Sequence, residues 1–135
     1  MADTVTILCV EDDPDISALL RLLLKGEHCV PAIVATPEEA REFLRHTRPD
    51  LLLLDLMLPH ASGLDLLAEL REEERFRDLP VVVATVMTDT VERVRARALG
   101  VRHYITKPFA PFELRAVLSK VLGRPAEELW PGPGK

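Results

Sequence analysis

The chain has 135 residues and is 47% hydrophobic, which gives enough apolar material for one core but too little length for two ordinary domains. Its formal net charge of −5 argues against direct binding to nucleic-acid phosphates, which needs a basic surface, and favours binding of a metal cation. The N-terminus has no basic segment before an apolar stretch, and no apolar run approaches the ~20 residues of a membrane span. We therefore expect a cytoplasmic protein that does not contact a membrane.

Short apolar runs alternate along the chain with segments of helical periodicity, a pattern typical of βαβ units and a parallel sheet. Five strands are predicted, at Val5–Val10, Val30–Ala35, Leu51–Asp55, Val81–Thr85 and Val101–Thr106. The run at 51–54 is wholly apolar, as expected of a strand whose two faces are both covered. The sequence therefore predicts an α/β fold with a doubly wound, five-stranded parallel sheet and five helices.

Each strand is followed by a helix with its own start or stop signals. Asp13 caps the first helix ahead of Pro14, Gly26 closes it, and Thr36 with Glu39 forms a capping box for the second. The later helices are predicted from Leu64 to Glu74, from a cap at Thr88 or Asp89 to near Leu99, and from Ala110 to Leu122. Residues 1–123 form one domain in this prediction, and the Pro- and Gly-rich segment 124–135 is expected to be a flexible tail.

Polar and charged side chains stand where four of the predicted strands end. An acidic run starting at Glu11 follows the first strand, Asp55 ends the third, Thr85 ends the fourth and Lys107 follows the fifth. The carboxyl ends of parallel strands open at one edge of the sheet, where open α/β folds bind their ligands. Taken singly, each residue also fits a simpler role as a strand-end acid, a cap or a solvated charge; the ordered set predicts a shared site.

This ordered set resembles the receiver domain of two-component response regulators over about Thr4–Leu122. The resemblance is carried by the acidic pair, by Asp55, Pro59 and Gly63 in a D-x-x-x-P-x-x-x-G spacing, by Thr85, and by Lys107-Pro108-Phe109. It implies the flavodoxin-like topology of that family. In the family the acidic pair directly follows the strand, which implies Glu11 and Asp12 as the pair and leaves Asp13 as the helix cap.

The resemblance implies that Asp55 accepts a phosphoryl group from a phosphohistidine on a sensor histidine kinase or phosphotransfer protein. Phosphoryl transfer spreads negative charge over three oxygens and needs positioned counter-charge. The resemblance accordingly implies Mg²⁺ held by Asp12, Asp55 and the main-chain carbonyl of Met57, with Glu11 acting through a water.

Two further strand-end residues complete the implied chemistry. Lys107 would pair with Asp55 before reaction and with a phosphoryl oxygen afterwards, while the Thr85 hydroxyl would donate to another oxygen. Tyr104 matches the family's aromatic switch position, so its ring is expected to turn inward when Thr85 moves toward the new charge. The surface of the fourth helix, fifth strand and last helix would then change for an effector protein. Tyr104 also fits a simple packing role.

Several residues depart from the family pattern. Val86 stands where a small residue is usual, and Met57 and Met87 flank the path of a hydrolytic water with apolar bulk, so we predict slow loss of the phosphoryl group. Arg102-His103 stands where one large DNA-binding subfamily carries acidic residues, which weakens the expectation of its symmetric dimer. Whether the chain forms a phosphorylation-dependent homodimer stays an open question at this point.

Two surface features have open interpretations. Arg93, Arg95, Arg97 and Arg102 make the fourth helix and its exit basic, either as a partner-facing surface or as a solvated face. Leu22 lies off the main apolar stripe of the first helix and either helps to dock a kinase or packs at the edge of the core.

Three functional classes are compatible with parts of this sequence. The leading interpretation is a phosphorylatable receiver that signals by surface contact, either alone or excised from a longer regulator; it would catalyse its own phosphorylation and slow autodephosphorylation without being a turnover enzyme. The second is a pseudo-receiver binding module, against which the complete set of acids with Thr85 and Lys107 argues. The third is a phosphohydrolase of the haloacid dehalogenase type, which needs a second acid where Met57 stands.

Overall fold

Five parallel strands form the central sheet in the order β2-β1-β3-β6-β7. The structure is a computed structural model that describes residues 4–58, 61–86 and 90–132. The sheet strands are β1 Val5–Val10, β2 Cys29–Val34, β3 Leu51–Leu54, β6 Val81–Thr85 and β7 His103–Thr106. A short antiparallel pair, β4 Met57–Leu58 with β5 Ala61–Ser62, lies beyond the end of β3. The strand order confirms the predicted doubly wound parallel sheet of flavodoxin-like topology.

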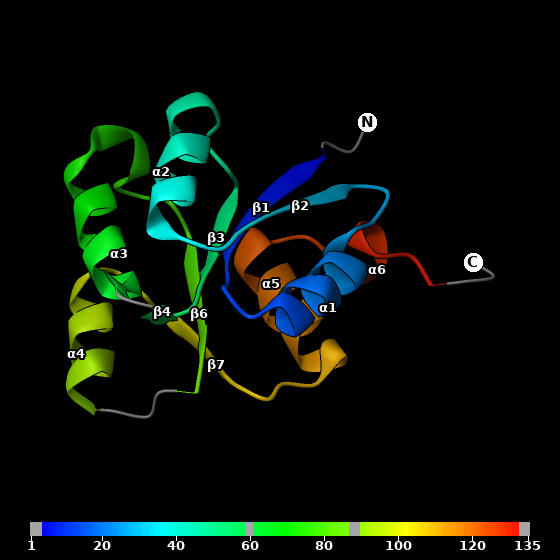
Figure 1. Cartoon of the computed structure of the whole chain (residues 1–135). Helices are drawn as coiled ribbons and strands as arrows, with labels where there is room; N and C mark the ends of the chain where they lie inside the picture. Colours follow the sequence, from blue (N-terminus) through cyan, green and yellow to red (C-terminus); the bar gives the residue numbers. More distant parts are fainter. Residues whose placement is uncertain (1–3, 59–60, 87–89, 133–135) are drawn as a thin grey trace.

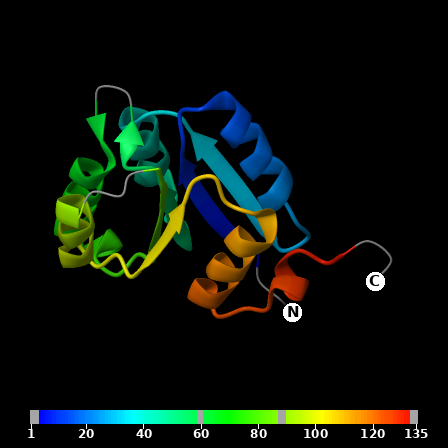
Figure 2. The same ribbon diagram turned by 90° about the horizontal axis from the view of Figure 1, so that it is seen from below.

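Helices cover both faces of this sheet. They are α1 Pro14–Leu24, α2 Pro37–His46, α3 Gly63–Glu72, α4 Thr90–Ala98, α5 Pro111–Leu122 and α6 Ala126–Leu129, with a 3₁₀ turn, η1, at Glu74–Phe76. Figure 1 shows α2, α3 and α4 on one side of the sheet and α1, α5 and α6 on the other, and Figure 2 shows the same layers from below. No helix within the described part of the chain combines the length and apolarity needed to cross a bilayer.

Local capping signals in the sequence account for the helix starts. Asp13 Oδ1 accepts from the Asp15 amide at 2.8 Å, and Thr36 Oγ1 accepts from the Glu39 amide at 3.1 Å. Gly123 adopts a left-handed φ of 69° where α5 ends. These predicted caps are confirmed, whereas the cap expected for α4 at residues 88–89 lies outside the described residues.

Alternate residues along each strand enter two separate cores. On β1, Leu8 and Val10 pack on the side of α2, α3 and α4, while Ile7 and Cys9 pack on the side of α1 and α5. β3 and β6 contribute to both cores in the same alternating manner. Because both sheet faces are filled with apolar side chains, the strand ends are where polar groups can gather.

The C-terminal segment differs from the prediction of a flexible tail. Leu129 and Trp130 are buried, and Trp130 Nε1 donates to the Leu24 carbonyl at 2.7 Å. A Cβ on Gly26 would lie 2.2 Å from the Leu129 carbonyl oxygen, so the glycine allows this close approach. The prediction was therefore wrong for 124–130: this segment packs on the end of α1, and α6 is a sixth helix. Residues 133–135 lie outside the description.

Candidate functional site

The strand register brings the predicted site residues to one edge of the sheet. β1 pairs with β3 so that Val10 lies beside Leu54, which sets the following residues, Glu11 and Asp55, side by side. β6 pairs with β7 so that Thr85 lies beside Thr106, one residue before the site lysine. The carboxyl ends of four strands therefore meet here, as the sequence predicted.

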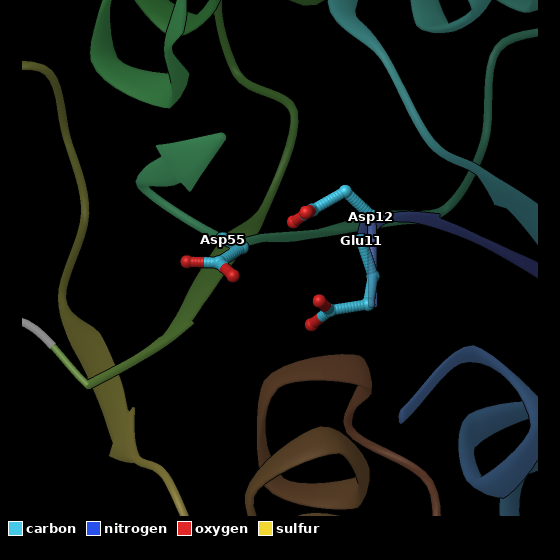
Figure 3. Close-up of side chains that lie close together, drawn as sticks. All are labelled: Glu11, Asp12 and Asp55. Atoms are coloured by element: carbon cyan, nitrogen blue, oxygen red, sulfur yellow. The ribbon is translucent and has the colours of Figure 1, made fainter. Parts of the chain in front are cut away.

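Three carboxylates gather at the ends of β1 and β3. Oxygen atoms of Glu11, Asp12 and Asp55 all lie within 4.8 Å of one another, and Figure 3 shows the three side chains at the adjoining strand ends. Glu11 and Asp55 are buried, whereas Asp12 is exposed to solvent. Hard oxygen donors at this spacing fit a divalent cation such as Mg²⁺, and the exposed acid leaves a route from solvent. Asp13 caps α1 instead of joining the cluster.

The ammonium group of Lys107 joins two of these acids. Its Nζ atom lies 2.8 Å from Asp55 Oδ2 and also donates to Glu11 Oε1. Burial disfavours the charged ammonium, but the hydrogen bonds to Asp55 and Glu11 outweigh that effect and raise the pKa of Lys107. The contact with Asp55 agrees with the sequence prediction, whereas the contact with Glu11 was not anticipated.

The backbone after Asp55 turns sharply around its carboxylate. The Met57 amide donates to Asp55 Oδ1 at 3.0 Å, so both carboxylate oxygens have a protein donor. A Cβ at Gly63 would lie 2.5 Å from the Asp55 carbonyl oxygen, which explains why this position of the motif holds glycine. Pro59, the middle residue of the motif, lies outside the described residues.

The two expected switch residues occupy different environments. Thr85 is buried at the end of β6, and its carbonyl accepts from the Lys107 amide at 3.0 Å. Tyr104 is partly buried on the edge strand β7: the Arg93 guanidinium lies 4.8 Å from its ring centre, and its hydroxyl donates to the Arg93 carbonyl at 3.5 Å. The sequence marked Arg93 only as part of a basic surface, since nothing local indicates which ring it contacts.

Apolar side chains follow the site on two loops. Met57 and Val86 are both about half exposed, so apolar surface lies two positions after Asp55 and one position after Thr85. Met87, the third residue expected to hinder a hydrolytic water, lies outside the described residues. Leu22 on α1 is also exposed, which fits the docking interpretation better than the core-edge one.

Comparison with known proteins agrees with this architecture. The sequence profile of the response regulator receiver domain matches residues 7–119. The transcriptional regulatory protein BaeR of Escherichia coli is 37% identical over 129 residues, covering 94% of this chain and 52% of BaeR. The DNA-binding response regulator MtrA of Mycolicibacterium smegmatis is 40% identical over 127 residues, covering 91% of this chain and 54% of MtrA. The chain thus spans about half the length of these curated relatives.

The fold is shared with solved receiver structures. The crystal structure of a response regulator receiver protein from Pseudomonas putida superposes with a TM-score of 0.81 at 30% identity, covering 89% of this chain and 99% of that one. The profile match covers most of the chain and includes every site residue described above. This protein belongs to the response regulator receiver domain family of two-component systems.

Proposed function

We propose that Asp55 is the phosphoacceptor of this receiver and takes its phosphoryl group from a phosphohistidine on a sensor histidine kinase or phosphotransfer protein. The observation that carries this proposal is the Lys107 ammonium 2.8 Å from the Asp55 carboxylate, within a cluster of three acids at the sheet edge. A buried carboxylate with a positioned cation and further acids beside it is suited to group transfer.

The reaction exchanges one phosphorus bond for another. A carboxylate oxygen of Asp55 attacks phosphorus, the bond from phosphorus to the imidazole nitrogen breaks, and the electron pair stays on that nitrogen. Lys107 then shifts from the carboxylate to a phosphoryl oxygen, and the Thr85 hydroxyl donates to another. Asp12, Asp55 and the Met57 carbonyl would hold Mg²⁺, with Glu11 acting through a water, and the ion would supply counter-charge to the phosphoryl oxygens when bound.

Phosphorylation would switch the surface around Tyr104. The new phosphoryl group adds roughly −1.5 to −2 charges, which attract the Thr85 hydroxyl and the loop after it. Tyr104 lies on the strand beside β6 and contacts α4 through Arg93, so rearrangement of that loop would release the ring from the helix. The face formed by α4, β7 and α5 would then bind its effector differently.

In this proposal the protein acts in the cytoplasm and passes its signal on by contact with another protein or domain. BaeR is named a transcriptional regulator and MtrA a DNA-binding regulator, and each is about twice as long as this chain. If this chain is part of such a regulator, the same face would act on an attached output domain or form a phosphorylation-dependent homodimer. The net charge of −5 favours a protein contact over direct binding of nucleic acid by this domain.

Intact-mass measurement after incubation with acetyl phosphate and Mg²⁺ tests the proposal. We expect one phosphoryl adduct on the wild-type chain, labile to base, and none on Asp55→Asn or in the magnesium-free control. An adduct that survives in Asp55→Asn would move the acceptor elsewhere, and no adduct under any condition would favour a pseudo-receiver. Sustained release of phosphate from a small ester would instead indicate a phosphohydrolase.

A further inference from the structure

A basic groove separates α4 from the edge strand β7. It has a volume of about 430 Å³ and is lined by Thr90, Arg93, Val94, Arg97, Arg102 and Tyr104. The four helix residues recur at i, i+3, i+4 and i+7, which places them on one face of α4. Positions 102 and 104 alternate along extended backbone, so they point to the same side of β7. A helix face and a strand face thus line one groove.

The charge of this basic groove is not balanced within the described residues. Of the described residues that line it, three are arginines and none is an acid. Arg97 and Arg102 form no ion pair in the described part of the chain, whereas Arg95, on another face of α4, pairs with Glu92 at 3.4 Å. This local positive charge stands out in a chain with a net charge of −5. Because salt screens charges over about 8 Å at physiological ionic strength, a bound segment would respond chiefly to these arginines.

The rim of the basic groove also exposes apolar surface. Val94 lines the groove with 63% of its surface exposed, and Val91, one turn earlier on α4, is exposed to a similar extent. Adjacent exposed valines beside these arginines form a mixed surface that one ligand could cover through both apolar and charged contacts.

We propose that the basic groove binds an acidic segment of a partner protein, with carboxylates facing Arg97 and Arg102 and an apolar side chain covering Val94. Guanidinium groups pair well with carboxylates because their planar forks match in geometry. Three arginines form too small a basic footprint for nucleic acid on an acidic domain. The acidic segment specifies the kind of partner that the proposed function requires. Only the dependence of binding on phosphorylation rests on that proposed function.

The groove is connected to the proposed switch through one shared residue. Tyr104 lines the groove, and its ring lies under the Arg93 guanidinium while its hydroxyl donates to the Arg93 carbonyl. Movement of the ring would change the floor of the groove and release Arg93 to a ligand. Phosphorylation of Asp55 should therefore change affinity for the acidic segment without contributing a contact to it.

Fluorescence anisotropy with a synthetic peptide tests the proposal in the full chain. The probe is a fluorescein-labelled peptide in which glutamates flank a pair of leucines; glutamines replace the glutamates in the matched peptide. We expect binding of the acidic peptide only, weakening with added salt. Arg97→Glu and, from the strand side, Arg102→Glu should each reduce affinity at least about tenfold. Arg21→Glu, the same charge change at an exposed position on α1, should leave it within about twofold.

Several results would overturn the proposal. The proposal is wrong if the acidic peptide does not bind, or if Arg21→Glu loses as much affinity for it as Arg97→Glu does. It is also wrong if the groove prefers a labelled DNA duplex to the peptide. A dimer seen by sedimentation and lost in Arg97→Glu would assign the groove to a second copy of the chain. If the peptide binds in the groove but acetyl phosphate gives no phosphoryl adduct, the proposed phosphorylation is rejected and the acidic partner is retained. If the adduct forms but the peptide does not bind, the acidic partner is rejected and the proposed phosphorylation is retained.

Discussion

Replacing Lys107 with methionine should strongly destabilise the metal-free protein. The side chains of Lys107, Glu11 and Asp55 are each less than a tenth exposed, and the ammonium contacts both acids. Removing one partner of a buried ion pair costs about 3–5 kcal/mol because the remaining charge stays away from water. Methionine keeps a stem of similar length, so the change measures mainly the loss of the cation. We expect the free energy of unfolding to fall by about 3–5 kcal/mol at pH 7.

Urea unfolding and thermal scans in EDTA measure this loss. For 135 residues, an unfolding entropy of about 2.1 cal/mol/K per residue gives about 0.28 kcal/mol/K, so Tm should fall by about 11–18 °C. Lys120→Met is the matched control, because Lys120 is exposed near the end of α5, and it should cost less than about 1 kcal/mol. A loss below about 1 kcal/mol for Lys107→Met would show that the two acids do not depend on the ammonium.

The pH dependence of this loss has a definite sign. The hydrogen bonds to Asp55 and Glu11 raise the pKa of Lys107 above its ordinary value of about 10.4 despite burial. A raised pKa stabilises the fold fully below the unfolded pKa, and this stabilisation disappears as the pH rises through the folded pKa. The difference between wild type and Lys107→Met should therefore stay constant between about pH 7 and 9 and shrink only above about pH 10.4. A difference that shrinks near neutral pH would contradict the assignment.

Three further predictions concern the site and the C-terminal segment. Asp12→Asn relieves repulsion in the acid cluster, so without metal it should raise the free energy of unfolding by about 0.2–1 kcal/mol. It should also abolish stabilisation by Mg²⁺, which thermal scans with and without the ion would show. Met57→Asn should speed loss of the phosphoryl group in a mass-based time course; an unchanged rate would reject exclusion of water by the methionine. Trp130→Ala should cost about 3–5 kcal/mol in urea unfolding, against less than about 0.5 for the exposed Phe112→Ala, and equal costs would contradict docking of the segment.

The strand ends were predictable because each depends on a local pattern. The apolar run before Asp55 and the alternation of strands with helices are enough to place this acid at the carboxyl edge of a parallel sheet. The contact between Lys107 and Glu11 depends instead on the order of the strands in space. These residues are 96 positions apart, directly after two strands that are not neighbours in the sheet, and both side chains reach toward Asp55. No local sequence pattern indicates that Lys107 and Glu11 are in contact.

The docked C-terminal segment was missed for a different reason. Proline and glycine around α6 suggested a loop, and Gly26 was assigned only to the end of a helix. The informative residues were Leu129 and Trp130, a large apolar pair that would be costly to expose. Their partner surface, at the end of α1, lies more than 100 residues earlier in the chain, since Trp130 and Leu24 are 106 positions apart. The composition of a short segment could not indicate that this surface was available.

The short strand β7 explains how chemistry at Asp55 could reach the basic groove. Its C-terminal end leads directly to Lys107, whose amide donates to the Thr85 carbonyl, and its middle carries Tyr104 in the groove. If phosphorylation draws the Thr85 hydroxyl toward Asp55, this main-chain hydrogen bond carries the displacement into β7 whatever side chains the strand holds. Substitutions that disrupt signalling should therefore concentrate at Thr85, where the displacement begins, and at Tyr104, where it changes the groove. Thr106, an exposed residue of β7 between Tyr104 and Lys107, should tolerate replacement as long as the strand register is kept.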